Sequence, residues 1–532
     1  MPRFIPYNID QHAMVVINFR HQLQPGTFEY AVHYLIEHKL DLSVFYPKYR
    51  NEATGRRAYD PAILLKVILF AYSKGITSSR EMQWCCETNI LFKALACDTV
   101  PHFTTLAAFV SNHAEEIEAL FEQVLLVCQE QGLLGNELFA IDGCKMSSDA
   151  SKEWSGTFKE LGEKRDKLRR LIRHRLQEHH QHDEAATEAE LDQQIREANT
   201  IQSLDEAKTK IERFLETQSP RKGQGKRGKE VKSNITDNES AKMTTGKGTI
   251  QGYNGVATVD KKHQVIIDAQ AFGEGQEHHT LKPVLERVEQ RYRRLGIHSD
   301  IYGTGTVVTA DTGFANEANA RYLHQRQING YIPDHQFRQR DPAFAEQKAK
   351  YGKRHQHTQK PDHKQIIPAS EFHFDPVNIT CDCPAGNRLS YRGTRKDNNG
   401  TSRAYFEGRL LQCRHCPKKH QCMQMPSAAD HRHGKGRQVS FALDHKRAPN
   451  YTDWMKHRVD SAEGKRIYSH RMSVVEPVFG NIGTTKRLNR FSLRGKRKVQ
   501  GQWQLYCLVT TSRNWPITGS WPHEEARPKC SR

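Results

Sequence analysis

The sequence has no hydrophobic run long enough to cross a bilayer. Its longest apolar stretch, residues 62–72, is interrupted by Lys66, whereas a membrane-spanning helix needs about 20 predominantly apolar residues. The N-terminal residues MPRFIPYNID also lack the apolar segment of a secretory signal peptide. We therefore expect a cytoplasmic protein that makes no use of a membrane.

Acidic residues are also in short supply. Over 532 residues, 61 Asp and Glu stand against 80 Lys and Arg, which gives a formal net charge of +19 and a pI of about 9.3. Such an excess makes a polyanion the first partner to consider. Hydrophobic residues reach only 36%, but apolar clusters and 22 Phe argue against wholesale disorder. The length predicts two or more domains.

The first region, to about residue 134, has the periodicity of helices joined by short turns. Asp60 can cap a helix that starts with Pro61 and ends at Gly75. Thr77 or Ser78 is expected to begin the next helix, and Thr104 or Thr105 a later one. This spacing suits a helix-turn-helix fold, although a plain helical bundle without DNA contact fits the same pattern.

From residue 137 the pattern changes to short apolar runs. We expect a buried strand at 137–142, a hairpin around 260–262, and an alternation of helix and strand at 280–295, 305–313, 316–327 and 330–334. That order predicts an α/β protein, α+β overall, with a mixed sheet flanked by helices. Residues 157–217 read as an inserted pair of antiparallel helices. The basic linker 221–232 is expected to be mobile and near DNA.

Three acids occupy positions where metal chemistry is plausible: Asp142 and Asp311 end predicted strands, and Glu476 lies in a late helix. Ends of adjacent strands meet at one edge of a sheet, and grouped carboxylates suit Mg²⁺ or Mn²⁺. Two such ions roughly 3.5 to 4 Å apart stabilise the attacking and leaving oxygens of phosphoryl transfer.

Plainer interpretations of these acids stay open. Asp142 before Gly143 is a common turn pair, Asp311 can cap the helix after it, and Glu476 before Pro477 suits a helix start. Spacing alone does not dismiss three rival acids, which are Asp149, Asp237 and Asp268.

Five segments in order resemble the DDE transposases of bacterial insertion sequences, in the branch with an N-terminal helical domain and a cysteine-bearing insertion. They are YDPAILLKVILFAYSKGITSSREMQ, AIDGCKMSSDAS, GYNGVATVDKKHQVI, VTADTGFANEANARYL with GYIPD, and VVEPVFGNI. The resemblance implies a ribonuclease-H-like catalytic domain, with Asp142, Asp311 and Glu476 as the DDE triad holding two Mg²⁺ or Mn²⁺ ions. It further implies double-stranded DNA as partner, both element ends and target, a homodimer on paired ends, and a place on the bacterial nucleoid.

The chain departs from the family pattern near the last acid. The family often carries Lys seven positions after the Glu, where this chain has Gly483, and Lys486 follows about one turn later. The family's Tyr and Arg ahead of the Glu are approximated by Tyr468 and Arg471, and the latter is expected to help position DNA.

Five of the twelve cysteines fall within some forty residues, and in a cytosolic chain this favours metal over disulfides. Cys413-x-x-Cys416 can present two thiolates to one tetrahedral Zn²⁺, and two more cysteines close a structural site. The resemblance favours Cys383 over Cys381 as the fourth ligand, together with Cys422. His415 or His420 could replace one of these ligands. The insertion is expected to be a zinc-ribbon-like unit too polar to build a core, with zinc supplying its folding free energy. Reduced cysteines in a poorly ordered insertion are the alternative.

Residues 477–499 contain no acid, and they follow the proposed catalytic Glu directly. We expect such a run to bind DNA phosphates without recognising the base sequence. A solvated basic face has the same composition. The basic residues are Lys486, Arg487, Arg490, Arg494, Lys496, Arg497 and Lys498.

These inferences combine into one domain plan and one function. We expect a DNA-binding helical domain at 1–134, a catalytic domain at 135–334 with an insertion at 157–232, a basic cysteine-bearing insertion at 335–460, the end of the catalytic domain at 461–515, and a tail at 516–532. The expected activity is metal-dependent cleavage at element ends followed by strand transfer of the 3′-OH. A nuclease without strand transfer and a catalytically inactive DNA-binding derivative remain as alternatives.

Overall fold

The computed structural model describes residues 16–49, 57–182, 188–223, 228–246, 248–344, 366–396, 402–443 and 450–512. The chain divides into two compact units, one made of Met1–Phe337 with Met455–Arg532 and the other of Arg338–Trp454. No described helix is both long and apolar enough to span a membrane.

The N-terminal part of the first unit is helical, as predicted. Its helices are α1 Phe19–Gln22, α2 Phe28–Tyr34, α3 Pro61–Ser73, α4 Ser79–Thr88, α5 Ile90–Leu95, α6 Phe103–Asn112 and α7 Ala114–Glu130. The Asp60 carboxylate accepts a hydrogen bond from the Ala62 amide at 2.8 Å, and Gly75 takes a φ of +79° just after α3. The expected start of α6 at Thr104 or Thr105 is wrong, because the helix begins at Phe103 and the His102 side chain caps it.

The sheet of the first unit is mixed, as predicted. It consists of β1 Leu138–Ser147, β4 Ala241–Thr245, β5 Gly248–Asp260, β6 Ile266–Phe272, β7 Val307–Ala310 and β8 Asn329–Tyr331. The order is β4-β5-β1-β7-β8, with β6 also on β5. Strands β1, β7 and β8 are parallel, whereas β5 is antiparallel to β1, β4 and β6. Strand β4 had no counterpart in the sequence analysis.

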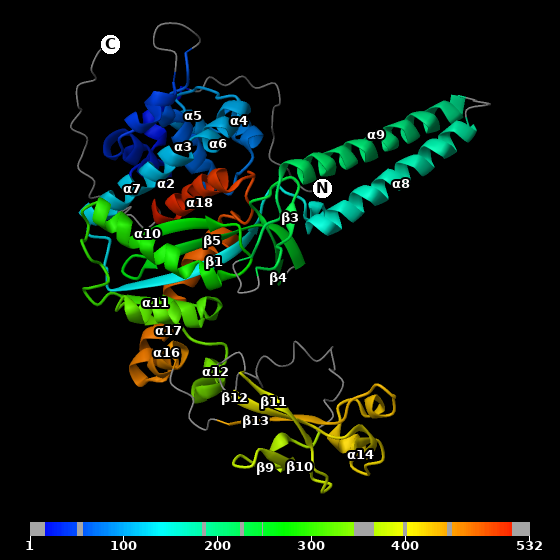
Figure 1. Cartoon of the computed structure of the whole chain (residues 1–532). Helices are drawn as coiled ribbons and strands as arrows, with labels where there is room; N and C mark the ends of the chain where they lie inside the picture. The colour runs from blue at the N-terminus through cyan, green and yellow to red at the C-terminus, as the bar shows by residue number, and fades with distance from the viewer. Residues whose placement is uncertain are drawn as a thin grey trace, which may run out of the picture. The chain divides into compact units, whose positions relative to one another are not determined.

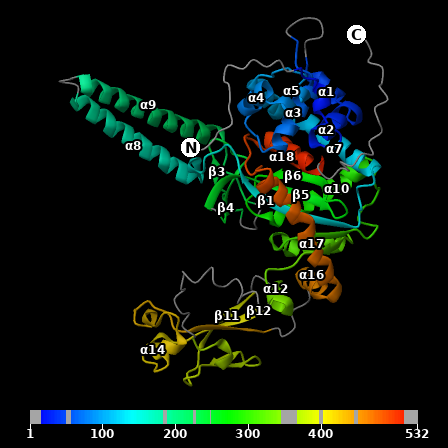
Figure 2. The ribbon, with the colours of Figure 1, turned by 180° about the vertical axis from the view of Figure 1, so that it is seen from behind.

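Helices cover this sheet, and the last one ties it to the N-terminal helices. The helices around it are α10 Leu281–Arg294, α11 Glu317–Gln325, α17 Ala462–Gly480 and α18 Lys496–Thr511, together with α16 Tyr451–Asp460, which crosses the unit boundary at Met455. Figures 1 and 2 show α18 between the sheet and the N-terminal helices, in agreement with its contacts to β6, α3, α6 and α7. Trp503 of α18 is fully buried and donates to the Val256 carbonyl of β5 at 3.1 Å.

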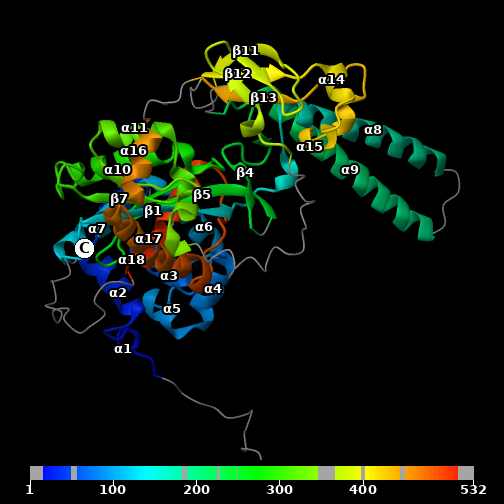
Figure 3. The ribbon, with the colours of Figure 1, turned by 90° about the horizontal axis from the view of Figure 1, so that it is seen from below.

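The predicted helical insertion is present as α8 Phe158–His182 and α9 Glu188–Thr217, which lie side by side as a long hairpin (Figure 3). Leu161, Ile211 and Phe214 form a small buried cluster at its base. Short strands β2 Ser155–Gly156 and β3 Ser233–Asn234 pair beside it. Part of the linker that is expected to be mobile, residues 224–227, lies outside the described residues.

The second unit has its own core, so the expectation that this insertion is too polar to build one is wrong. Strands β11 Ser390–Lys396, β12 Ser402–Glu407 and β13 Gln438–Ala442 form one sheet, and β9 His373–Asp375 pairs with β10 Thr380–Asp382. Alternation along these short strands turns a few apolar side chains inward. They are Phe372, Cys381, Leu389, Ala404, Phe406 and Val439. Three short helices complete the described helices: α12 Phe337–Arg340, which spans the unit boundary, and α14 Leu410–Arg414 and α15 Lys419–Cys422 of this unit.

A buried ion network joins α10, β6 and α7. The Arg291 side chain is 1% exposed; it bonds Asp268 of β6, which is equally buried, and donates to Glu118 of α7 at 2.5 Å and to Glu122 at 3.4 Å. This network fixes the N-terminal helices to the sheet with charges that have little access to water.

Replacing Arg291 by Met is expected to destabilise the fold by about 3–5 kcal/mol, because it leaves the buried Asp268 carboxylate without a counter-charge. Urea unfolding of the full chain measures the loss. Arg293→Met on the same helix is the control, since the exposed Arg293–Glu289 pair is worth about 1 kcal/mol or less. Equal effects of the two substitutions would contradict a structural role for the network.

Candidate active site

The candidate site lies where the parallel pairing of β1 with β7 ends. The last paired residues are Ile141 and Ala310, so Asp142 and Asp311 are the first residues beyond the pair on each strand. Because paired residues of parallel strands lie side by side, the two acids are neighbours, with Asp142 still inside β1 and Asp311 just past the end of β7. The coupling between their charges contributes to the pKa of Asp142.

Asp142 lies within a strand, so the interpretation of Asp142-Gly143 as a turn is wrong. Strand β1 continues to Ser147 because the long strand β5 pairs with it beyond the end of β7. The Asp142 carboxylate accepts from the Gly143 amide at 2.9 Å and pairs with the Arg471 guanidinium of α17 at 2.9 Å. Burial raises the pKa of Asp142, and Arg471 opposes that rise.

Asp311 directly follows β7 and caps the 3₁₀ turn Thr312–Phe314. Its Oδ1 accepts from the Gly313 amide at 2.8 Å. Asp311 therefore acts as a cap, as one interpretation of the sequence expected, but what it caps is a single 3₁₀ turn. Capping uses one oxygen and leaves the carboxylate at the end of β7, where the parallel pairing with β1 stops.

A third acid at this point, Glu277, was missed by the sequence analysis. It begins the 3₁₀ turn Glu277–His279 that leads into α10, and its Oε1 accepts from the Asn254 amide of β5 at 3.1 Å. Burial raises its pKa, and the charge of Asp311 and, more weakly, that of Asp142 add to the rise. Its nearness to both aspartates follows from strand pairing at long range, which spacing along the chain does not reveal.

Glu476 lies on α17, with its side chain exposed. The suggestion that it starts a helix is wrong, because α17 begins at Ala462 and has Pro477 in its interior. Five residues separate Glu476 from Arg471, which corresponds to a turn of roughly 140° around the helix. Helix α17 contacts β1 and β7, and Arg471 is its residue that reaches Asp142.

The three rival acids have structural partners. Asp268 pairs with the buried Arg291. Asp237 accepts from the Tyr253 hydroxyl at 2.8 Å and from the Gly495 amide at 3.1 Å. Asp149 pairs with Arg494 at 3.0 Å.

The donor set beside β1 and β7 consists of hard carboxylate oxygens, which suit Mg²⁺ or Mn²⁺. As these side chains stand, no group of three or more His, Cys, Asp or Glu within the described residues is arranged to hold a metal ion. Arg471 instead supplies the positive charge beside Asp142. The donor chemistry fits a hard divalent cation, and binding it requires the carboxylates to draw together.

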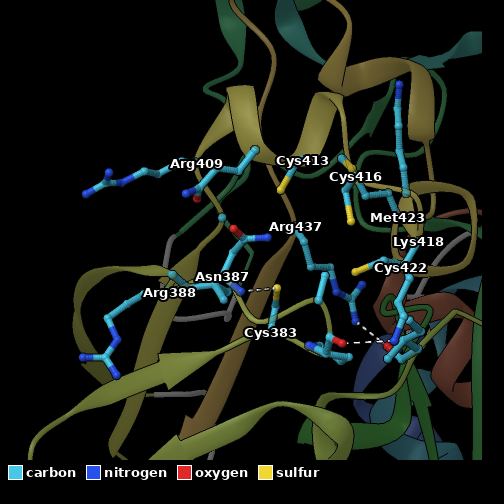
Figure 4. Close-up of a pocket in the computed structure, with 17 residues that line it drawn as sticks. Cys383, Asn387, Arg388, Arg409, Cys413, Cys416, Lys418, Cys422, Met423 and Arg437 are labelled. Carbon is cyan, nitrogen blue, oxygen red and sulfur yellow. Dashed lines mark hydrogen bonds between the residues drawn. The ribbon is translucent and has the colours of Figure 1, made fainter.

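In the second unit, four cysteines line one pocket (Figure 4). Their sulfur atoms face a common space between the turn after β10 and the helices α14 and α15; the four are Cys383, Cys413, Cys416 and Cys422. Burial raises the pKa of the Cys413 and Cys422 thiols, and the other thiols of the group add to the rise. The thiols are thus close enough to interact, and removing their protons is a cost that metal binding has to meet.

The other candidates for a zinc ligand lie elsewhere. Cys381 is fully buried in the apolar core of the second unit. His415 and His420 have exposed side chains, and neither is among the residues that line the pocket.

Much of the basic segment after Glu476 is engaged by acids. Arg490 and Arg494 pair with Asp149, and Arg497 pairs with Glu115. Lys486 is buried and bonds the Asn481 side chain. The exposed basic side chains of the segment are those of Arg487, Arg490, Arg494, Lys496, Arg497 and Lys498. Arg471 is 6% exposed, so its guanidinium has little access to solvent and pairs with Asp142 instead.

Two family models match the chain. One, described as a transposase DDE domain, matches residues 382–511, and the other, described as transposase domain (DUF772), matches residues 17–112. The first match includes Glu476, the four cysteines and the basic segment, and the second covers α1 to α6. Asp142, Glu277 and Asp311 lie outside both. No curated protein and no solved structure matches the chain.

Replacing Arg471 by Met is expected to destabilise the fold more at pH 8 than at pH 5. Loss of the guanidinium raises the pKa of the partly buried Asp142 further above its unfolded value, and the resulting penalty is absent below the unfolded pKa and grows as pH rises. Urea unfolding at the two pH values measures the difference.

The double variant Arg471→Met, Asp142→Asn is the matched control for this prediction. Because it has no buried carboxylate at position 142, its loss of stability relative to wild type is expected to vary much less with pH. A loss in the single variant that is the same at both pH values would contradict the assigned ion pair.

Proposed function

The two family matches indicate an insertion-sequence DDE transposase, and from that premise we propose that the chain cuts DNA at the ends of its own mobile element and joins the freed 3′-OH to target DNA. The observation that carries the proposal is the placement of Asp142 and Asp311 side by side where the parallel pairing of β1 with β7 stops. A mixed sheet with this pair of acids, covered by helices, also supports the proposal of a ribonuclease-H-like catalytic domain.

In the proposed reaction, Asp142, Asp311 and Glu476 hold Mg²⁺ or Mn²⁺. When bound, two such ions stabilise the attacking and leaving oxygens of an in-line phosphoryl displacement. Arg471 keeps the Asp142 carboxylate oriented and balances its charge within the fold. The Gly313 amide holds one oxygen of Asp311, so both aspartates are positioned before DNA arrives.

DNA is proposed to lie along the exposed basic side chains after α17. Contacts of this kind bind phosphates and position the duplex without reading its sequence. Reading of the element ends is assigned to the N-terminal helices, and a homodimer on paired ends follows by family analogy.

We further propose that the second unit is zinc-ribbon-like and binds one structural Zn²⁺ through Cys383, Cys413, Cys416 and Cys422. The support is their shared pocket, since four thiolates form a closed tetrahedral site with no position open for catalysis. Zinc would add to the stability that the small apolar core already gives this unit.

An inactive DNA-binding derivative is the second candidate, and one observation favours it. Gly483 stands where the family often has Lys, and Lys486 is 5% exposed and bonded to Asn481, so it does not substitute as a free cation. The cleavage experiment below separates the two candidates.

Asp142→Asn, Asp311→Asn and Glu476→Gln are each expected to reduce Mg²⁺-dependent cleavage of an element end by about a thousandfold, equivalent to about 4 kcal/mol of transition-state stabilisation. DNA binding should persist, since the basic segment is unchanged. Asp166→Asn, on the exposed face of α8, is the control and should cut like wild type. Full cleavage by any one variant removes that residue from the triad, and no cleavage by the wild type favours the inactive derivative.

Purified full-length protein is expected to carry one zinc ion per chain, measured by atomic emission. Cys413→Ser and Cys422→Ser should each lose it, whereas Cys381→Ala should keep it because Cys381 lies in the apolar core. Zinc retained by both serine variants would rule out the four-cysteine site.

A further inference from the structure

Glu277 stands between the two aspartates of the site. A Cβ added at Gly143 would lie 2.8 Å from Oε1 of Glu277, and one added at Gly313 would collide with its Oε2 while lying 2.9 Å from Oδ1 of Asp311. Gly143 directly follows Asp142, and Gly313 lies two residues after Asp311. The Glu277 carboxylate therefore reaches the backbone beside both of them.

The charges at this point do not balance. Three partly buried acids meet here, and the cations described near them are Arg471, which pairs with Asp142, and Lys145, whose charge acts weakly on Glu277. Among the described residues, Glu277 accepts a hydrogen bond from the neutral Asn254 amide and has no ion pair. Carboxylates withdrawn from water without a counter-charge are costly, so the arrangement favours a bound cation.

Asn254 supplies an independent sign of a missing ligand. Its side chain is 0% exposed, its amide nitrogen is used by Glu277, and its Oδ1 has no hydrogen-bond partner. A Cβ added at Gly143 would lie 2.8 Å from this Oδ1 and 2.8 Å from Oε1 of Glu277. The two oxygens therefore approach the same point. Buried amide oxygens are nearly always satisfied, and a carbonyl oxygen is a suitable ligand for a hard cation or for its water.

We propose that Glu277 is a metal-holding carboxylate of this site, beside Asp142 and Asp311, with the Asn254 Oδ1 turned toward the same ion or a water bound to it. This assignment rests on the proposed function and adds a fourth acid to the three of the DDE pattern. Glycine at positions 143 and 313 leaves the space that any side chain would fill. The acid comes from the turn before α10, so the ion would be held partly by an element outside β1, β7 and α17.

Mn²⁺ binding to the DNA-free full chain tests the assignment, with the electron paramagnetic resonance signal of free Mn²⁺ as readout. Glu277→Gln should weaken Mn²⁺ affinity at least tenfold. Glu286→Gln is the matched control, because Glu286 lies on α10 with an exposed side chain paired to Lys282, and it should bind within twofold of wild type.

A thermal melt without metal shows whether Glu277→Gln is folded, and its midpoint should not fall below that of wild type, since the amide keeps the size of the side chain and removes repulsion between acids. If that variant is not recovered folded, Glu277→Asp takes its place. It keeps the charge, draws the carboxylate back by one methylene, and should also bind Mn²⁺ more weakly.

Wild-type Mn²⁺ affinity in a folded Glu277 variant overturns the inference. If Asp142→Asn loses Mn²⁺ binding in the same assay, the proposed function stands without Glu277. A wild-type protein that binds no Mn²⁺ contradicts both the inference and the metal-dependent reaction.

Discussion

The parallel pairing of β1 with β7 is the constraint on which the candidate site depends. Its last pair, Ile141 with Ala310, sets Asp142 and Asp311 side by side, and β5 keeps β1 straight past that point by pairing as far as Ser147. A shift of β1 by one residue would turn Asp142 to the other face of the sheet. Register is therefore what brings together two acids that stand far apart in the sequence.

Ion pairs connect other elements of the first unit to the strands of the sheet. Arg471 of α17 bonds Asp142 within the sheet, and Arg291 of α10 joins β6 to α7 through buried acids. Helix α18 adds apolar packing between the sheet and the N-terminal helices. The chain leaves this unit after β8 and returns at α16, so the cysteine-bearing unit is inserted where the sheet is already complete. An insertion placed there does not interrupt the strand pairing on which the site depends.

Features written in local sequence were predictable, and features created by long-range pairing were not. The cap at Asp60, the α8–α9 hairpin and the strand order follow from local signals that tertiary contacts did not override. Asp142-Gly143 has the signature of a turn, but the length of β5 makes it strand. Glu277 carries no motif, and strand pairing alone brings it to the aspartates. The basic segment was expected to be free for phosphates, yet acids from distant elements, such as Asp149 and Glu115, take several of its side chains.

The central claim is that a divalent cation binds where the pairing of β1 with β7 stops. Fe²⁺ can replace Mg²⁺ at a site of oxygen ligands, and with ascorbate and peroxide it generates radicals that cut the nearby protein backbone. On the DNA-free full chain, the account predicts cuts close to residues 142–143, 277 and 311–313, which excess Mg²⁺ suppresses. Cuts confined to other parts of the chain, or cuts at these residues that Mg²⁺ does not suppress, would contradict it.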